Sequence, residues 1–139
     1  MSIGGVDCRT RRVLREETAM ILVVDDETII LDVSTRVLEM HGFKVLTAES
    51  VKGALDVAQE HSGDIRLAIV DIGLPDGEGW KVCEGLWALN PDITVFMSSG
   101  NPVTEFPSWL NIPPNRLDTI DKPYGMKELV DKVRPVMEA

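Results

Sequence analysis

The stretch LAIVDIGLPDG, residues 67–77, decides the fold class of this 139-residue chain. Its first four residues form a short, continuous apolar run, which is typical of a strand buried on both faces of a parallel sheet. The run stops at Asp71, and residues 73–77 are rich in turn-forming glycine, proline and aspartate. We therefore expect a buried strand that ends on a carboxylate at one edge of a sheet.

Similar apolar runs lie on both sides of this stretch and predict four more strands, at 21–24, 43–46, 93–97 and 117–121. Between the runs, apolar residues recur at helical spacing and predict helices with these residues facing inward. The expected inward positions are Ile30, Val33, Val37 and Leu38; Val51, Ala54, Leu55 and Ala58; Val82, Cys83, Leu86 and Leu89; and Met126, Leu129, Val130 and Val133. Strands that alternate with helices predict a doubly wound α/β sheet flanked by helices.

Prolines interrupt this pattern near the end of the chain. The prolines within 102–114 leave room for at most a short helix near 105–110, and Pro135 is expected to kink or end the last helix. Ser50 is placed to cap the second helix, and Gly42 to end the first in a left-handed conformation.

Composition and charge exclude several classes of protein. The length fits one domain, and the longest apolar runs are far shorter than the roughly 18 residues of a membrane span. The net charge of −9 argues against nucleic-acid binding, which requires clustered Lys and Arg. The arginine-containing start of the chain has no apolar stretch after it and is not a secretory signal, so we expect a cytoplasmic location.

The predicted strand ends carry residues suited to one kind of chemistry, namely Asp25 and Asp26, then Asp71, then Ser99, then Lys122. In a doubly wound sheet the ligand site lies beyond these ends. Carboxylates that meet there repel one another, and Mg²⁺, which prefers oxygen ligands and water, relieves that repulsion. A lysine and a hydroxyl add a positive charge and a donor for an anion. The set predicts a phosphoryl-transfer site with a carboxylate as covalent acceptor. Each part alone is equally typical of an ordinary turn or surface dipeptide.

The order of these motifs resembles the receiver domain of two-component response regulators, the chemotaxis-type member of the flavodoxin-like folds. The resemblance covers about residues 20–138, and the matching pieces are ILVVDDE (21–27), LAIVDIGLPDGEG (67–79), TVFMSSG (94–100) and DKPY (121–124). It implies a five-stranded parallel sheet with strand order 2-1-3-4-5 and, in this chain, an irregular fourth helix. The implied receiver domain is 20–139, after an N-terminal extension at 1–19.

The resemblance also implies how the acids divide their roles. Asp71 is similar to the phosphorylated aspartate of the family. Asp26 resembles the direct Mg²⁺ ligand, and Asp25 the acid that holds the metal through water. The backbone carbonyl of Gly73 is implied as a further ligand.

The remaining implied contacts are with the phosphoryl group. Ser99 fills the Ser/Thr position that bonds a phosphoryl oxygen, because it directly precedes the small residue Gly100, whereas Ser98 does not. Lys122 is implied to bind the phosphoryl oxygens and the carboxylate of the acceptor. A cis peptide before Pro123 is implied to aim this lysine inward.

Three departures from the family pattern concern signalling and the lifetime of the phosphoryl group. Receivers usually carry Tyr or Phe three residues before the lysine, where this chain has Thr119, so the aromatic switch is missing or altered. The prolines of the fourth helix disturb the common dimerisation face. Gly73 has no side chain to guide a hydrolytic water, which leaves Asn101 as the polar candidate, and we expect slow self-dephosphorylation.

Other functions remain as alternatives. A degenerate receiver that only binds partners is one, because of Thr119. A haloacid-dehalogenase-type phosphatase also uses an aspartate after a buried strand, but it needs a second acid where this chain has Gly73. A flavodoxin needs a hydroxyl- and glycine-rich phosphate loop after the first strand, where Asp25, Asp26 and Glu27 would repel phosphate.

The resemblance implies partners as well. We expect a phosphoacceptor that assists its own phosphorylation but is not a classical enzyme. The expected donor is a histidine kinase or a histidine phosphotransfer protein, and the downstream target is a protein; the chain is expected to be a monomer or weak dimer. About one helix follows Lys122, so we expect a stand-alone regulator or the receiver of a hybrid kinase. Trp80 and Trp87 are interpreted as helix-edge packing or, alternatively, as a partner surface that Trp109 extends.

Overall fold

A computed structural model of the chain describes residues 19–99, 106–122 and 124–138. These residues form seven strands and four helices. In chain order the elements are β1 (Met20–Val24), α2 (Thr28–Met40), β2 (Lys44–Ala48), α3 (Val51–His61), β3 (Ile65–Asp71), β4 (Gly73–Leu74), β5 (Gly77–Glu78), α4 (Gly79–Leu89), β6 (Thr94–Ser99), β7 (Leu117–Asp121) and α5 (Met126–Met137).

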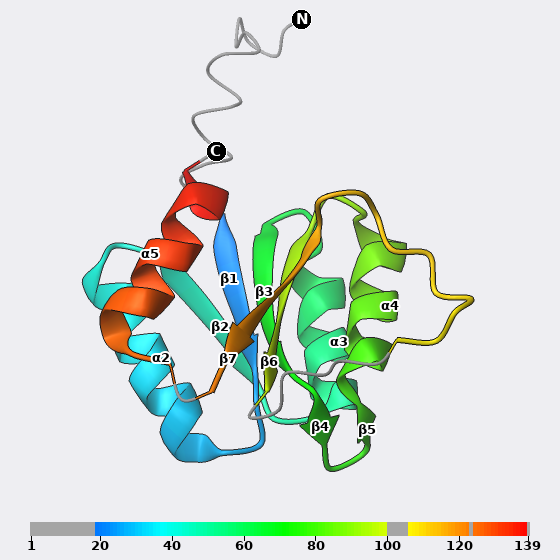
Figure 1. Ribbon diagram of the computed structural model, residues 1–139, viewed down its shortest axis with the longest axis horizontal. Helices are drawn as coiled ribbons and strands as arrows, with labels where there is room; N and C mark the ends of the chain where they lie inside the picture. The colour runs from blue at the N-terminus through cyan, green and yellow to red at the C-terminus, as the bar shows by residue number, and fades with distance from the viewer. Residues whose placement is uncertain (1–18, 100–105, 123, 139) are drawn as a thin grey trace, which may run out of the picture.

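Five strands form one parallel sheet in the order β2-β1-β3-β6-β7, while β4 and β5 form a separate antiparallel hairpin (Figure 1). Counted without the hairpin, this is the predicted order 2-1-3-4-5, so the predicted doubly wound fold is confirmed. The order changes direction between β1 and β3, which is where such sheets place their ligand site. The register pairs Asp71 with Ser98 and Ser99 with Asp121, so neighbouring strands end side by side.

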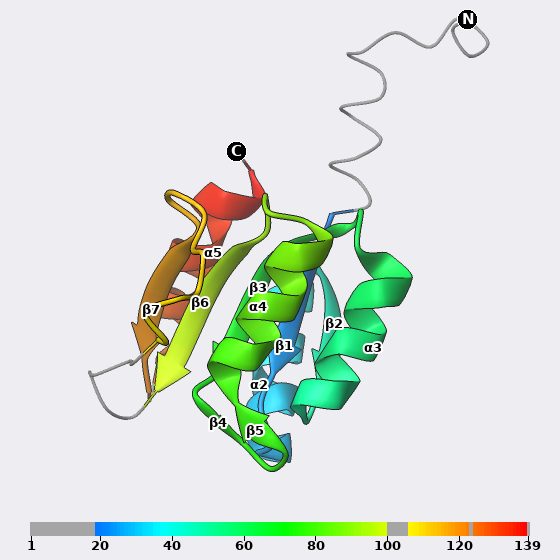
Figure 2. The same cartoon turned by 90° about the vertical axis from the view of Figure 1, so that its right-hand side faces the viewer.

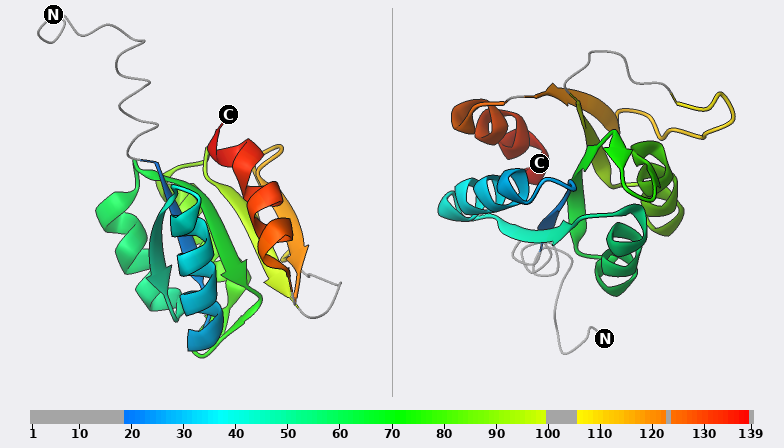
Figure 3. Two further views of the ribbon diagram at one scale, coloured as in Figure 1. Left: turned by 90° about the vertical axis from the view of Figure 1, so that its left-hand side faces the viewer. Right: turned by 90° about the horizontal axis from the view of Figure 1, so that it is seen from below.

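The helices cover both faces of the sheet: α2 and α5 lie on one face, and α3 and α4 on the other (Figures 2 and 3). Alternate residues of the central strands supply the two cores. In β1, Ile21 and Val23 face α2 and α5, whereas Leu22 and Val24 face α3 and α4. This double burial explains why the strands are apolar without alternation.

Helix ends follow local signals, as predicted. The Ser50 hydroxyl accepts a hydrogen bond from the Gly53 amide at 2.9 Å and caps α3. Gly42 has a φ of +89°, the left-handed conformation that closes α2.

The rotation of two helices differs from the prediction. Val33 of α2 and Leu89 of α4, both expected to face inward, are 49% and 41% exposed. Met126, also expected inward, is 56% exposed at the start of α5. Ser34 and Trp87 take the buried places instead. The polar group of each side chain has a hydrogen-bond partner there. The Ser34 hydroxyl lies 3.3 Å from the Tyr124 hydroxyl, and the Trp87 indole N–H donates to the Ile93 carbonyl at 2.8 Å. Ser34 is thus held inside by a partner 90 residues away, whereas the partner of Trp87 lies only six residues along the chain.

The chain between β6 and β7 is irregular, as predicted. Its described part, 106–116, contains turns but no helix, and residues 100–105 lie outside the described residues. Phe106 and Leu110 pack against the core under α3 and α4. Pro135 does not end α5, which continues to Met137. None of the helices in the described ranges is both long and apolar enough for a bilayer.

Candidate functional site

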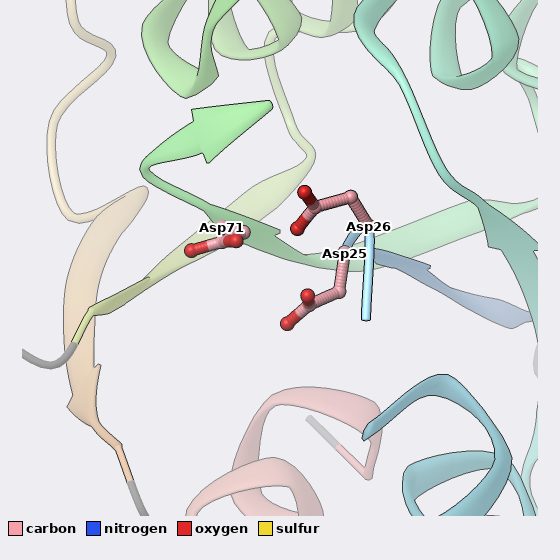
Figure 4. A group of neighbouring side chains, drawn as sticks. All are labelled: Asp25, Asp26 and Asp71. Atoms are coloured by element: carbon pink, nitrogen blue, oxygen red, sulfur yellow. The ribbon is translucent and has the colours of Figure 1, made fainter. Parts of the chain in front are cut away.

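Three carboxylates meet at the carboxyl edge of the sheet. Asp25 and Asp26 follow β1, and Asp71 is the last residue of the adjacent strand β3. Figure 4 shows the three side chains close together beyond the strand ends, and each offers an oxygen that lies within 4.8 Å of the others. The sequence prediction that these acids converge is therefore matched by the structure.

Lys122 lies among these acids. Its Nζ donates to Asp25 Oδ2 at 2.7 Å and lies 3.4 Å from Asp71 Oδ1 and 3.8 Å from Glu27 Oε1. Asp25 is only 2% exposed, and its second oxygen accepts the Glu27 amide at 2.9 Å. A buried carboxylate without such partners would be costly. Because Lys122 directly follows β7, the predicted lysine reaches acids that follow strands two (β3) and three (β1) places away in the sheet.

Charge is not balanced at this edge. One lysine faces the carboxylates of Asp25, Asp71 and Glu27, with Asp26 nearby. Burial raises the pKa of Asp71, and the charges of Asp25 and Asp26 raise it further, against the opposing effect of Lys122. The excess of oxygen donors and negative charge suits a hard divalent cation.

The pKa of Lys122 shows how strongly the acids hold it. Burial by itself would lower this pKa, but the hydrogen bond and the charge of Asp25, followed by the charge of Asp71, outweigh burial and raise it. Lys122 is therefore cationic at neutral pH, and it can serve as a fixed positive group for an anion.

The loop after Asp71 is held close to β6. The Ile72 amide donates to the Ser98 carbonyl at 3.2 Å, and the Gly79 amide donates to the Ile72 carbonyl at 2.6 Å. A Cβ on Gly79 would lie 2.2 Å from the Asp71 carbonyl oxygen, so only glycine fits at the start of α4. Sequence analysis missed this requirement; the signal was a glycine that follows the LPDG turn.

The hydroxyl predicted from β6 lies at the end of its strand. The backbone of Ser99 pairs with Asp121, while its side chain, like Gly100, Asn101 and Pro123, lies outside the described residues. Ser98 is 1% exposed, and its hydroxyl has no hydrogen-bond partner among the described residues.

Two tryptophans that sequence analysis grouped together lie in different environments. Trp87 is buried, so the packing interpretation is confirmed for this residue and its place on a partner surface is wrong. Trp80 makes an edge-to-face contact with Trp109 at 5.4 Å between ring centroids, and Trp109 is 64% exposed. These two rings join α4 to the irregular segment.

The fold and the acidic edge together define an α/β domain of the phosphoryl-accepting signalling class. The family model for the response regulator receiver domain matches residues 21–134, and the chain belongs to this family. It is a receiver domain, the phosphoacceptor module of two-component systems. The resemblance predicted from the sequence is confirmed, and the phosphatase and flavodoxin alternatives are set aside.

Curated relatives place similar domains in larger proteins. The transcriptional regulatory protein KdpE of Mycobacterium tuberculosis (strain ATCC 25618 / H37Rv) is 34% identical over 117 residues, which are 83% of this chain and 49% of KdpE. The sensor kinase CckA of Brucella abortus (strain 2308) is 27% identical over 122 residues, 87% of this chain and 13% of CckA. The chain thus spans about half the length of KdpE and a smaller part of CckA.

Solved structures agree with the fold. The receiver domain from the hybrid histidine kinase CckA matches with a TM-score of 0.72 and 26% identity, covering 86% of this chain and 99% of that one. A CheY-like receiver domain protein from Methanospirillum hungatei JF-1 matches with a TM-score of 0.69 and 29% identity, covering 86% and 94%.

Proposed function

We propose that Asp71 is the phosphoacceptor of this receiver domain and that Mg²⁺ assists the transfer. The observation that carries the proposal is the position of Lys122, whose Nζ lies between the carboxylates of Asp25 and Asp71 at the edge where the strands end. Asp25 is buried, with both oxygens bonded, and Asp26 is exposed beside it. Asp71 is half-buried at the end of the central strand, and Lys122 Nζ lies 3.4 Å from its Oδ1, so it is both accessible and next to a cation that can neutralise an incoming phosphoryl group.

The proposed metal ligands are the carboxylates of Asp26 and Asp71 and the backbone carbonyl of Gly73, with Asp25 acting through water. When bound, Mg²⁺ supplies positive charge that offsets the charge developing on the transferred phosphoryl oxygens. The oxygen-only donor set and the excess negative charge of the site support this assignment.

The transfer itself is a displacement at phosphorus. A carboxylate oxygen of Asp71 forms a bond to the phosphorus of a phosphohistidine, the phosphorus–nitrogen bond breaks, and its electron pair returns to the imidazole. Lys122 Nζ neutralises phosphoryl oxygens, and the Ser99 hydroxyl donates to another. The products are an acyl phosphate on Asp71 and a free histidine.

The proposed donor is a histidine kinase or a histidine phosphotransfer protein, and the output is contact with a downstream protein. Ile29 and Val33 on α2 and Met126 at the start of α5 are exposed apolar side chains on elements that flank the acidic edge. A donor that brings its histidine to Asp71 must cover this rim. The net charge of −9 supports a protein partner rather than direct contact with nucleic acid. The proposed location is the cytoplasm, and the proposed state is a monomer or weak dimer. The match at 21–134 supports a receiver domain at 20–139 after an extension at 1–19.

The test is to incubate the protein with a small phosphodonor and Mg²⁺ and then to measure its intact mass by mass spectrometry. We expect the wild type to gain the mass of one phosphoryl group. This gain should be absent when a chelator removes Mg²⁺ and absent in Asp71→Asn. Asp92→Asn is the matched control, because this aspartate is 86% exposed in the turn before β6, at the other end of the sheet, and its loss should leave the gain unchanged. No gain in the wild type would favour the degenerate receiver instead.

A further inference from the structure

The carboxylate of Asp76 caps a helix to which it does not belong. Its Oδ1 accepts the Val51 amide at 2.7 Å, and its Oδ2 accepts the Lys52 amide at 3.0 Å. Both amides are in the first turn of α3, where no intrahelical partner exists. The Ser50 hydroxyl accepts the next amide, from Gly53. Two side chains therefore complete the start of α3, and one of them comes from 25 residues away.

Asp76 lies at the tip of the β4–β5 hairpin, which is the loop that leaves Asp71. The base of this loop is fixed by the bonds of Ile72 and Gly79 described above. Its tip packs directly on α3, because a Cβ on Gly77 would lie 3.4 Å from a methyl group of Val51. The hairpin and the first turn of α3 lie next to each other below the sheet (Figure 2). Hydrogen bonds thus hold the loop at its tip, through Asp76, as well as at its base, through Ile72 and Gly79.

The same stretch of chain also touches the other half of the acidic site. The Asp25 amide donates to the Ala48 carbonyl at 3.1 Å, and Ala48 ends β2 just before Ser50. Residues 48–52 therefore contact the Asp25 loop on one side and, through Asp76, the Asp71 loop on the other. One short stretch of chain therefore contacts both loops of the acidic site.

We propose that Asp76 is a positioning residue for the phosphoacceptor site: by fixing the hairpin against α3, it sets where Asp71 and the Gly73 carbonyl stand relative to Asp25. This inference rests on the proposed function, since Gly73 is a proposed ligand. Coupling is reciprocal, so a cation held by both loops must in turn stabilise the bonds of Asp76 to Val51 and Lys52.

The experiment compares Asp76→Ala with Ser50→Ala, a matched variant that removes a cap of the same helix but leaves the hairpin tied. Each protein is titrated with Mg²⁺ alone, and the shifts of its backbone amide signals in NMR spectra give the Mg²⁺ affinity. We expect Asp76→Ala to weaken Mg²⁺ binding by about 10-fold, as loss of a group that orients a ligand does. Ser50→Ala should keep the wild-type affinity. Asp76→Asn retains one of the two acceptor oxygens and should recover part of the loss.

A second readout needs no metal. In metal-free protein, hydrogen exchange of the Ile72 and Gly79 amides should be faster in Asp76→Ala than in Ser50→Ala, since only the former frees the hairpin. Equal effects of the two variants on Mg²⁺ affinity and on this exchange would overturn the proposal and reduce Asp76 to a helix cap. If the wild type bound no Mg²⁺, the proposed metal site would fail, while the exchange comparison would still decide whether Asp76 fixes the loop. If Asp76→Ala does not fold, the partial losses expected for Asp76→Asn are compared with Ser50→Ala in both readouts.

Discussion

Replacement of Gly79 by alanine tests whether the backbone around Asp71 is as tightly fitted as the structure indicates. The new Cβ would lie 2.2 Å from the Asp71 carbonyl oxygen and 2.9 Å from the Met97 terminal methyl group. Carbon and oxygen atoms normally approach no closer than about 3.3 Å, so the Asp71 backbone or the start of α4 must move by about 1 Å. The methionine can turn away, but the carbonyl cannot.

The expected loss of stability follows from two opposing effects. Alanine is the better helix former by at most about 1 kcal/mol. Overpacking against a backbone atom costs about 1–3 kcal/mol, and we expect the upper part of this range because no flexible side chain can yield. Gly79→Ala should therefore lower the free energy of unfolding by about 1–2 kcal/mol and Tm by about 5 °C. A 1 Å displacement of the acceptor should also slow phosphorylation by about 100-fold.

Thermal unfolding of the metal-free protein measures the change in Tm. The phosphorylation rate is measured by following the intact mass over time in the presence of a small phosphodonor and Mg²⁺. Gly73→Ala is the control in the same loop, because no described heavy atom lies within 4 Å of its Cβ position and its φ is outside the left-handed range. It should keep the wild-type stability within about 0.5 kcal/mol. A Gly79→Ala protein that is as stable and as rapidly phosphorylated as the wild type would refute the reasoning.

Four further outcomes are expected. Because burial and neighbouring acids raise the pKa of Asp71 above 3.8, metal-free wild type should lose stability relative to Asp71→Asn as pH rises through that raised value; a Tm gap that is constant with pH would contradict this. Ile29 is 76% exposed, so Ile29→Glu should leave Tm unchanged and slow transfer from a phosphohistidine protein about 10-fold, but not from a small phosphodonor. Since Gly73 offers no side chain to a hydrolytic water, the phosphorylated protein should persist for minutes, and a half-life of seconds by intact mass would disprove this. Burial raises the pKa of the Cys83 thiol to about 12, so alkylation at mildly basic pH should modify Cys83 only after denaturant is added, as peptide mass mapping would show.

The parts of the fold that sequence predicts are those with local causes. Residues 67–70 form a continuous apolar run that is typical of a strand buried between two layers, and Asp71 ends it. Parallel strands bring their carboxyl ends to one edge of the sheet. Asp25 and Asp71 therefore meet because the strands that they follow are neighbours in the sheet. The Ser50 cap and the left-handed Gly42 are equally local.

What sequence does not predict depends on partners that are distant along the chain. Val33 and Ser34 are adjacent, and the contact between Ser34 and Tyr124, 90 residues away, favours the polar one inside. The bonds from Asp76 to α3 and the close approach of Gly79 to Asp71 require the folded loop to exist first. Aspartate and glycine are also the residues of ordinary turns, so the glycine after LPDG is a weak signal and Asp76 carries no separate signal of its role.

The irregular segment between Phe106 and Arg116 makes this domain a practical scaffold for engineering. Phe106 and Leu110 anchor it to the core, whereas residues 111–115 cross the surface without joining the sheet or a helix. Circular permutants and inserted reporter domains are best accepted in such exposed connections. A fluorescent protein placed after Ile112 would leave the sheet and its acidic edge intact, which offers a route to a biosensor built on this receiver.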